Sequence, residues 1–306
     1  MRKKILISCF IGMLLASPGL SAQQGGSTNL SIKAGSGIFY GRMGEYVFNN
    51  TGKISELQWD MEGIFFFTSG LSFQWGRFLF NCSYLVGIPR EAGRVTDYDW
   101  NYNNVQGVDL YSRHSARTDS LHEAEVDLLY SFCYIGDFSL YGGFAYRYSY
   151  YRVEALGGYQ EYPAGTGTIS QTFSGRAMRY RQQYHIASMV VGCSYEISPI
   201  TISLKFAYSP LNFCQALDNH YLTNANYQDS MSFGHYFSGS LTLAYRFTDS
   251  LALELSGSAS GIPLFKGKTT QYNTNTGVVT HYPNGSSGAS LWQAHSSLSM
   301  RYFFSL

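Results

Sequence analysis

Apolar and polar residues alternate along much of this chain with the two-residue period of a β-strand. The C-terminal stretch is the clearest, because Leu298, Met300, Tyr302, Phe304 and Leu306 are separated mostly by Ser and Arg. Similar stretches occupy residues 30–40, 57–67, 71–86, 124–134, 138–151, 184–195, 200–208, 237–247 and 251–259. No segment keeps a 3.6-residue period over three turns, so helices are not expected. The pattern predicts ten strands.

Short and long connections alternate between these stretches. The short ones are Thr68-Ser69-Gly70, Ile135-Gly136-Asp137, Ile197-Ser198-Pro199 and Thr248-Asp249-Ser250. The long ones span residues 41–53, 87–122, 152–180, 209–234 and 260–290. This alternation is typical of bacterial barrels, which have short periplasmic turns and long outer loops. We therefore predict an all-β fold, a ten-stranded antiparallel transmembrane β-barrel with long extracellular loops and both termini in the periplasm.

The N-terminus has the features of a secretory signal. Met1-Arg2-Lys3-Lys4 is cationic, residues 5–16 are mostly apolar, and Leu20-Ser21-Ala22 offers a small-residue cleavage site. We expect residues 1–22 to be a signal peptide and residues 23–306 to form a single barrel domain.

Composition supports the barrel and argues against nucleic-acid binding. Aromatic residues make up 17% of the chain and charged residues only 13%, whereas soluble domains carry about 25% charged residues. Removal of residues 1–22 leaves 18 Lys and Arg against 20 Asp and Glu. A chain this close to neutral has no electrostatic basis for binding nucleic acid.

Four cysteines follow the predicted signal peptide, at positions 82, 133, 193 and 214. Three of them lie inside the strand patterns, and none has the close Cys and His spacing of a zinc site. We expect small buried or lipid-facing residues instead of disulfides or a metal site.

Two polar motifs in the long connections are candidates for chemistry. Asp97 and Asp99 lie in the second, and Asp218 and His220 lie in the fourth. In a ten-stranded ring these connections face each other, and i, i+2 spacing puts both members of a pair on one face of a strand. Such a groove suits activation of water by a histidine base. Solvated turn residues and, less readily, a divalent-metal site remain alternatives.

The chain resembles the omptins, ten-stranded outer-membrane proteases of Gram-negative bacteria. The resemblance rests on the strand layout and on four motifs, Glu45-Tyr46-Val47, Asp97-Tyr98-Asp99-Trp100, Ser112-Arg113-His114 and Asp218-Asn219-His220. It implies an endopeptidase of the bacterial outer membrane with its active site on the extracellular side. Its substrates would be peptides or proteins at the cell surface.

The family mechanism implied by this resemblance uses water and forms no covalent intermediate. A water held between Asp97 and His220 would attack the peptide carbonyl, with Asp218 supporting His220 and Asp99 assisting at the opposite wall. Ser112 and His114 would then be neighbours of the site, although they look like a serine-protease pair.

Specificity departs from the family pattern. Omptins typically cut beside Arg or Lys, and they bind the cation with a Glu in the first loop and an Asp two residues before the catalytic Asp. Glu45 matches the first position, but Ala216 occupies the second. The sequence therefore predicts cleavage near basic residues with relaxed specificity.

The lipid-binding pattern is also reduced. Omptins bind lipopolysaccharide as an activator through a set that includes Tyr-x-Glu-x-Arg, and here Tyr146-Arg147-Tyr148-Ser149-Tyr150 keeps only the first Tyr. Gln183 stands where a basic residue is expected. No other cofactor is implied, and we expect a monomer in contact with outer-membrane lipid.

The main alternative is a non-enzymatic barrel. A ten-stranded barrel is narrow, so a wide channel is not expected. An adhesin built from the Tyr- and Asn-rich loops, or a small pore, is the competing function.

Overall fold

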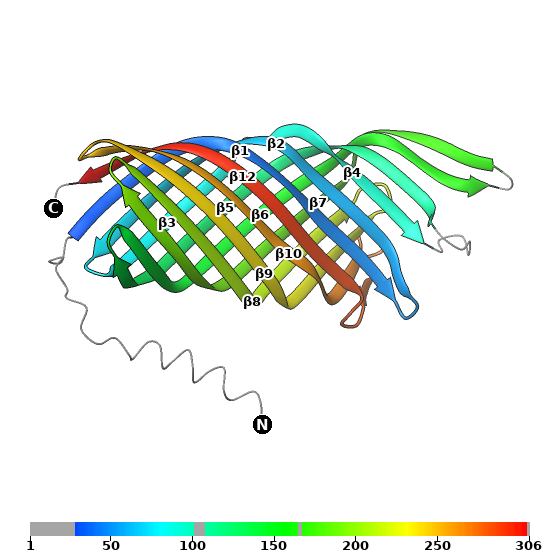
Figure 1. The fold of residues 1–306 in the computed structure, drawn as a ribbon. Coiled ribbons are helices and arrows are strands. Elements are labelled where there is room, and N and C mark those ends of the chain that lie inside the picture. The colour runs from blue at the N-terminus through cyan, green and yellow to red at the C-terminus, as the bar shows by residue number, and fades with distance from the viewer. Residues whose placement is uncertain (1–27, 101–107, 165–166, 305–306) are drawn as a thin grey trace, which may run out of the picture.

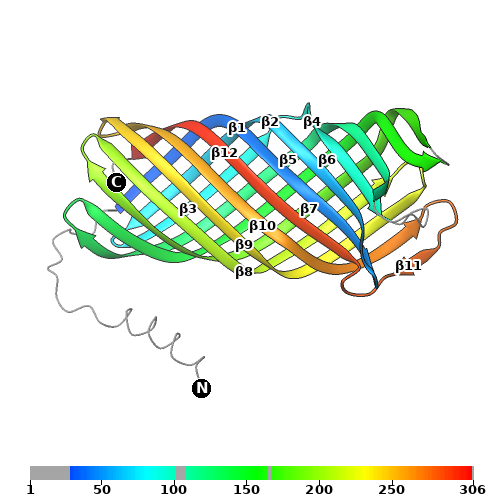
Figure 2. The same ribbon diagram turned by 45° about the vertical axis from the view of Figure 1, so that its right-hand side comes forward.

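The computed structural model describes residues 28–100, 108–164 and 167–304, which form one closed β-barrel (Figures 1 and 2). The predicted signal peptide lies outside these residues and stays a prediction. The strands are β1 (Thr28–Asn49), β2 (Gly52–Trp75), β3 (Phe78–Gly87), β4 (Arg90–Trp100), β5 (Val108–Ile135), β6 (Phe138–Ala164), β7 (Gly167–Ile197), β8 (Ile200–His220), β9 (Ala225–Thr248), β10 (Leu251–Asn273), β11 (Val279–His281) and β12 (Ser287–Phe304).

Neighbouring strands are antiparallel, and the first and last close the ring. β1 pairs with β2 on one side and with β12 on the other, and the latter register runs from Leu30 opposite Phe304 to Val47 opposite Ser287. β3 and β4 share one position in the ring because both pair with β2 and with β5. β11 pairs only with β10. The ring therefore has ten positions, which confirms the predicted fold class.

One predicted turn is wrong. Thr68-Ser69-Gly70 lies inside β2, and the reversal occurs at Gly76 and Arg77 instead. Gly76 has a φ of 57°, the left-handed conformation that glycine adopts most easily. Side chains continue to alternate from Phe65 to Trp75 without a break, because Ser69 simply takes an outward position. A polar triplet can thus lie within a strand although its composition predicts a turn.

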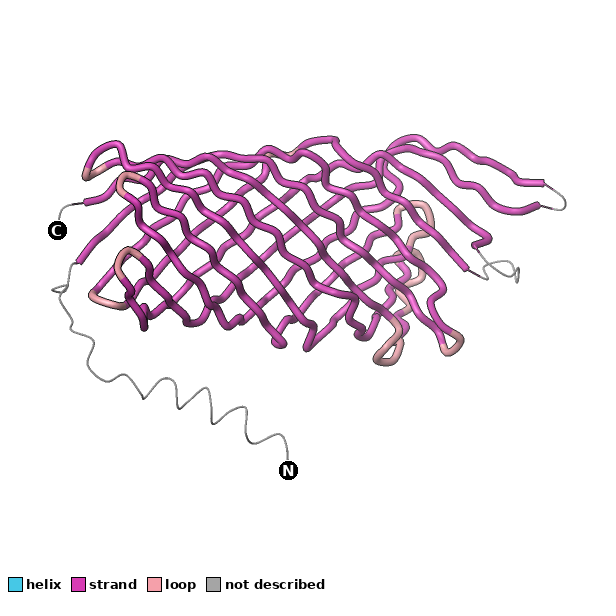
Figure 3. The backbone as a smooth tube through the Cα atoms, in the orientation of Figure 1, coloured by secondary structure: helices cyan, strands magenta, loops and turns pink. Residues whose placement is uncertain are grey.

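The long connections are also mostly strand. Paired backbone continues through most of the described residues in the predicted long loops, and the β6–β7 hairpin projects farthest (Figures 1 and 3). The short turns gather at the opposite end of the barrel, where the described chain begins and ends. The predicted loop boundaries are therefore wrong, because polar residues can extend a strand wherever the next strand offers backbone partners.

The wall is apolar outside and mixed inside. Outward residues such as Phe67, Phe144, Phe206 and Leu241 are exposed, as expected for a lipid-facing band. The described residues contain no helix that could cross a membrane. Cys82, Cys133, Cys193 and Cys214 are free thiols.

The interior has two halves. Towards the extended hairpins it is filled by a buried apolar cluster that includes Phe39, Trp59, Phe66, Tyr151 and Tyr184. Towards the short turns lies a polar cavity of about 1010 Å³.

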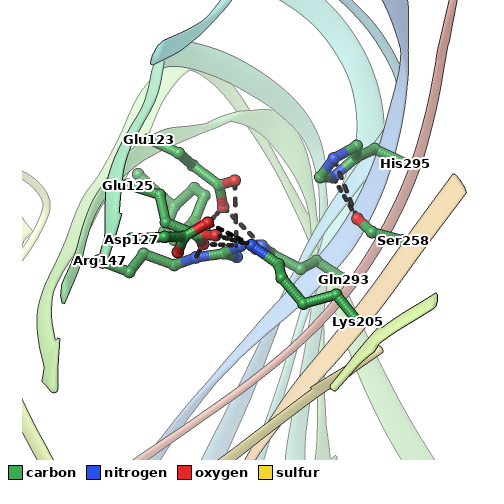
Figure 4. Close-up of polar contacts among 9 residues, drawn as sticks. Glu123, Glu125, Asp127, Arg147, Lys205, Ser258, Gln293 and His295 are labelled. Carbon is green, nitrogen blue, oxygen red and sulfur yellow. Dashed lines mark hydrogen bonds and ion pairs between the residues drawn. The ribbon is translucent and has the colours of Figure 1, made fainter. Parts of the chain in front are cut away.

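A charged network crosses the lumen at the boundary between the halves (Figure 4). Lys205 Nζ of β8 donates to Glu125 Oε1 at 2.5 Å and to Asp127 Oδ2 at 2.9 Å. Arg147 Nε of β6 donates to Glu125 Oε2 at 2.6 Å. These contacts connect β5 to its neighbour β6 and to β8 farther along the ring, and they satisfy charges in a narrow space where isolated ions are costly.

Lys205→Met should destabilise the barrel by about 2 kcal/mol, less than the full cost of breaking a buried pair because the lumen is partly hydrated. The change leaves Glu125 and Asp127 close together without their shared cation. Guanidinium unfolding in detergent micelles measures the effect, with Lys268→Met on the exposed part of β10 as the matched control. Equal unfolding midpoints for the two variants would contradict a structural role for the network.

Candidate active site

Asp97 and Asp99 reach the barrel interior because β4 is a strand and not a loop. Within the β2–β4–β5 sheet, Asp97 lies between Leu57 and Ser112. Leu57 also pairs with Glu45 of β1, so Glu45 and Asp97 lie in one row across the sheet. Leu57 and Glu45 are buried, which identifies the inner face, and Asp99 shares that face by its i, i+2 spacing.

A glycine bulge determines the path of β4. The register shifts between Glu91 and Arg94, and Gly93 within this bulge has a φ of 96°. A Cβ atom there would lie 2.4 Å from the backbone oxygen of Asp60. Only glycine combines this conformation with this close approach, so the strand that carries both aspartates depends on Gly93.

Asp218 and His220 lie near the end of β8. His220 Nε2 contacts Asp218 Oδ2 directly, and the edge of the imidazole packs against Tyr227, with ring centroids 5.4 Å apart. The Asp218 side chain is only 2% exposed, whereas that of His220 is 25% exposed. A buried carboxylate thus orients a histidine that remains accessible to a reactant.

Electrostatics link the two pairs. Burial lowers the pKa of His220, but the charges of Asp218, Asp97 and Asp99 outweigh it, and the pKa is raised overall. Burial and the charge of Asp99 raise the pKa of Asp97 well above its usual range, while His220 acts in the opposite direction. Such mutual effects require short separations, so the structure brings the four predicted residues together.

Glu45 and Ala216 lie beside this group. Glu45 is buried and accepts a hydrogen bond of 3.2 Å from Trp59 Nε1. The Trp59 ring stacks on Tyr180 with centroids 5.2 Å apart. Burial and the charges of Asp218 and Asp229 raise the pKa of Glu45 well above its usual range. Ala216 is also buried, two residues before Asp218, and adds no polar atom.

Ser112 and His114 are neighbours of the acidic pair. Ser112 lies directly opposite Asp97 in the β4–β5 register, and its Oγ is 3.2 Å from His114 Nε2. The other ring nitrogen of His114 lies 2.5 Å from the carbonyl oxygen of Gly157. Burial lowers the pKa of His114.

Asp229 is a nearby residue that the sequence analysis missed. It is buried on β9, directly opposite Ala216, and Thr269 Oγ1 donates to its Oδ1 at 2.7 Å. Burial raises the pKa of Asp229 to about 7. No local motif marks this residue, because its place depends on the register between β8 and β9.

The described residues contain no group of three or more His, Cys, Asp or Glu side chains arranged to hold a metal ion.

Two curated proteins are similar to the chain over most of its length. The outer membrane protease IcsP of Shigella flexneri is 23% identical over 269 residues, which cover 85% of each chain. The outer membrane protease OmpP of Escherichia coli K12 is 20% identical and covers 90% of this chain and 93% of its own.

The fold also matches a solved structure. The crystal structure of the outer membrane protease OmpT from Escherichia coli superposes with a TM-score of 0.86 at 19% identity, covering 93% of this chain and all of that one. The barrel is accordingly a protein of the bacterial outer membrane. The sequence model of the Omptin family matches residues 26–304, and the chain belongs to that family.

Proposed function

We propose that this protein is an outer-membrane endopeptidase in which Asp97, Asp99, Asp218 and His220 activate a water molecule. The observation that carries the proposal is the meeting of these residues from β4 and β8, with His220 in contact with a buried carboxylate. Family membership and the names of the relatives, all outer membrane proteases, support hydrolysis of peptides at the cell surface.

His220 is the general base in this proposal. The contact with Asp218 fixes the imidazole orientation and stabilises its protonated form after it takes a proton from water. Asp97 holds the water on the opposite wall. Because the water itself attacks the peptide carbonyl, no acyl-enzyme forms.

The raised pKa values of Asp97 and Asp99 support retention of a proton on this pair. Burial is the largest cause for both, and the charge of Asp99 adds to it for Asp97. Two adjacent carboxylates rarely ionise together in a dehydrated site. A proton retained here can be donated to the developing oxyanion or to the leaving amine.

Glu45 provides the substrate preference. Its buried carboxylate can pair with a basic side chain of the substrate, and Ala216 alone would leave that preference relaxed. We propose a monomer that cleaves surface-accessible peptides or proteins near such residues.

Lipopolysaccharide is proposed as a weak activator. Arg147 contacts Glu125 inside the lumen and is unavailable to lipid. Arg152 and Arg181 are paired across β6 and β7, and they follow the buried residues Tyr151 and Tyr180, so both occupy the outer face. Arg152 also forms an ion pair with Asp119 at 2.5 Å, so a lipid phosphate would share its guanidinium with that carboxylate. The two arginines offer phosphate contacts without the complete family pattern.

His220→Ala and Asp97→Ala should each lower kcat/KM by about 100- to 10,000-fold, the usual contribution of a positioned acid or base. Peptide cleavage by the refolded barrel measures this effect, with Ser112→Ala as the control. Full loss in Ser112→Ala with activity surviving in His220→Ala would favour a serine mechanism. No cleavage by any form, including the wild type, would favour an adhesin.

The rate should rise with pH as His220 loses its proton, with a midpoint above the ordinary histidine value because the surrounding carboxylates raise the pKa of His220. Asp218→Asn removes the largest of these raising effects. Its kcat/KM profile should therefore move towards lower pH while its maximum falls. If the low-pH side of the kcat/KM profile is at the same pH in Asp218→Asn as in the wild type, His220 is excluded as the titrating base.

The barrel refolded in detergent without lipopolysaccharide should have measurable peptidase activity. Addition of lipopolysaccharide should stimulate cleavage only modestly. Arg152→Gln should reduce that stimulation, since it removes a phosphate contact on the outer face. An absolute requirement for lipopolysaccharide, unaffected by Arg152→Gln, would show that lipid binds elsewhere.

A further inference from the structure

The β8–β9 register places a carboxylate where β8 itself has none. Asp229 of β9 is the direct partner of Ala216, and Thr269 of β10 is the next residue in the same row. Ala216 is 1% exposed and Asp229 is 4% exposed. Because directly opposed residues point to the same face of a sheet, Asp229 occupies the inner face beside the small Ala216 side chain.

Asp229 and Glu45 are two buried acids without a cation. Thr269 donates a hydrogen bond to Asp229, and Trp59 donates one to Glu45. Among the ion pairs between described residues, none involves either carboxylate. Buried carboxylates are normally paired with cations or protonated, so a cation that enters from outside would find two acceptors.

Glu45 and Asp229 lie on either side of the same buried aromatic pair. Burial raises the pKa of Tyr180, and the charges of Glu45 and Asp229 raise it further. The charge of Asp229 also acts on Glu45. Tyr180 and Trp59 are stacked and fully buried, and aromatic rings are surfaces on which a guanidinium can pack.

The two acids also lie near the water-activating group. Asp218 follows Ala216 by two residues on β8, and its charge acts on both Glu45 and Asp229. Asp218 is buried, and its Oδ1 has no hydrogen-bond partner among the described residues. A side chain bound between Glu45 and Asp229 would therefore hold its own peptide bond near His220.

We propose that Asp229 determines substrate specificity, binding together with Glu45 the Arg or Lys side chain beside the scissile bond. The second carboxylate comes from β9 in place of β8, and Ala216 provides the room for it. This inference rests on the proposed peptidase function. It replaces the relaxed specificity expected from Ala216 alone with a definite preference for a cation.

The test compares peptides that differ only in Arg or citrulline at the cleavage site, since citrulline is the neutral isostere of Arg. Asp229→Asn should lower the Arg-to-citrulline ratio of kcat/KM by about 100-fold, as expected when a desolvated charge pair loses one partner. Asp229→Ala/Ala216→Asp should recover most of the ratio by returning a carboxylate to β8. Asp249→Asn, in the β9–β10 turn, is the matched control and should keep the wild-type ratio.

A wild-type enzyme that cleaves, with an unchanged ratio in Asp229→Asn, would overturn this inference and leave the proposed function standing. That result would make Asp229 a structural acid hydrogen-bonded to Thr269. Absence of cleavage by the wild type would instead overturn the proposed function.

Binding measurements separate the two inferences without turnover. The probe is 4-aminobenzamidine, a fluorescent cation that mimics the arginine head group. The wild type and His220→Ala should bind it, and Asp229→Asn should bind it at least 10-fold more weakly. Equal affinity in Asp229→Asn, or no binding to the wild type, would overturn the assignment of Asp229.

Discussion

Closure of the sheet is the constraint on which the rest of this molecule depends. Backbone N–H and C=O groups cannot remain unpaired in a lipid environment, so a sheet that crosses a membrane must have no free edge. Pairing of β1 with β12 along the length of β12 satisfies this requirement. A closed wall also fixes the position of every strand relative to its neighbours. Inward-facing side chains from opposite sides of the ring therefore have definite partners across the interior.

The same pairing continues beyond the lipid-facing band and forms the candidate site there. β4 adds to β2 and β5 above the end of β3, and β8 continues to His220. Strands hold Asp97 and Asp218 more rigidly than free loops would. Because side chains alternate along a strand, acids two residues apart both face the interior. Aromatic packing around Trp59 and Tyr180 excludes water, which strengthens the interactions among these charges.

Buried acids inside the barrel occur in two different arrangements. In the charged network Lys205 and Arg147 neutralise nearby carboxylates, and these ion pairs stabilise the barrel. Around Glu45 and Asp229 the acids have hydrogen-bond donors but no cationic partner in the described chain. Neutralised carboxylates are typical of a structural framework, whereas buried acids without a cationic partner are typical of sites that bind a ligand.

The sequence by itself determined the β-barrel, its ten positions and the two motifs, because alternation and i, i+2 spacing are local properties. It failed where the outcome depended on distant partners. Thr68-Ser69-Gly70 resembles a turn in isolation, yet pairing with β3 and β1 keeps it extended. Ala216 indicated a lost carboxylate, and only the tertiary structure revealed Asp229 beside it. Register between strands is decided by cooperative pairing around the whole ring, so no short stretch of sequence contains it.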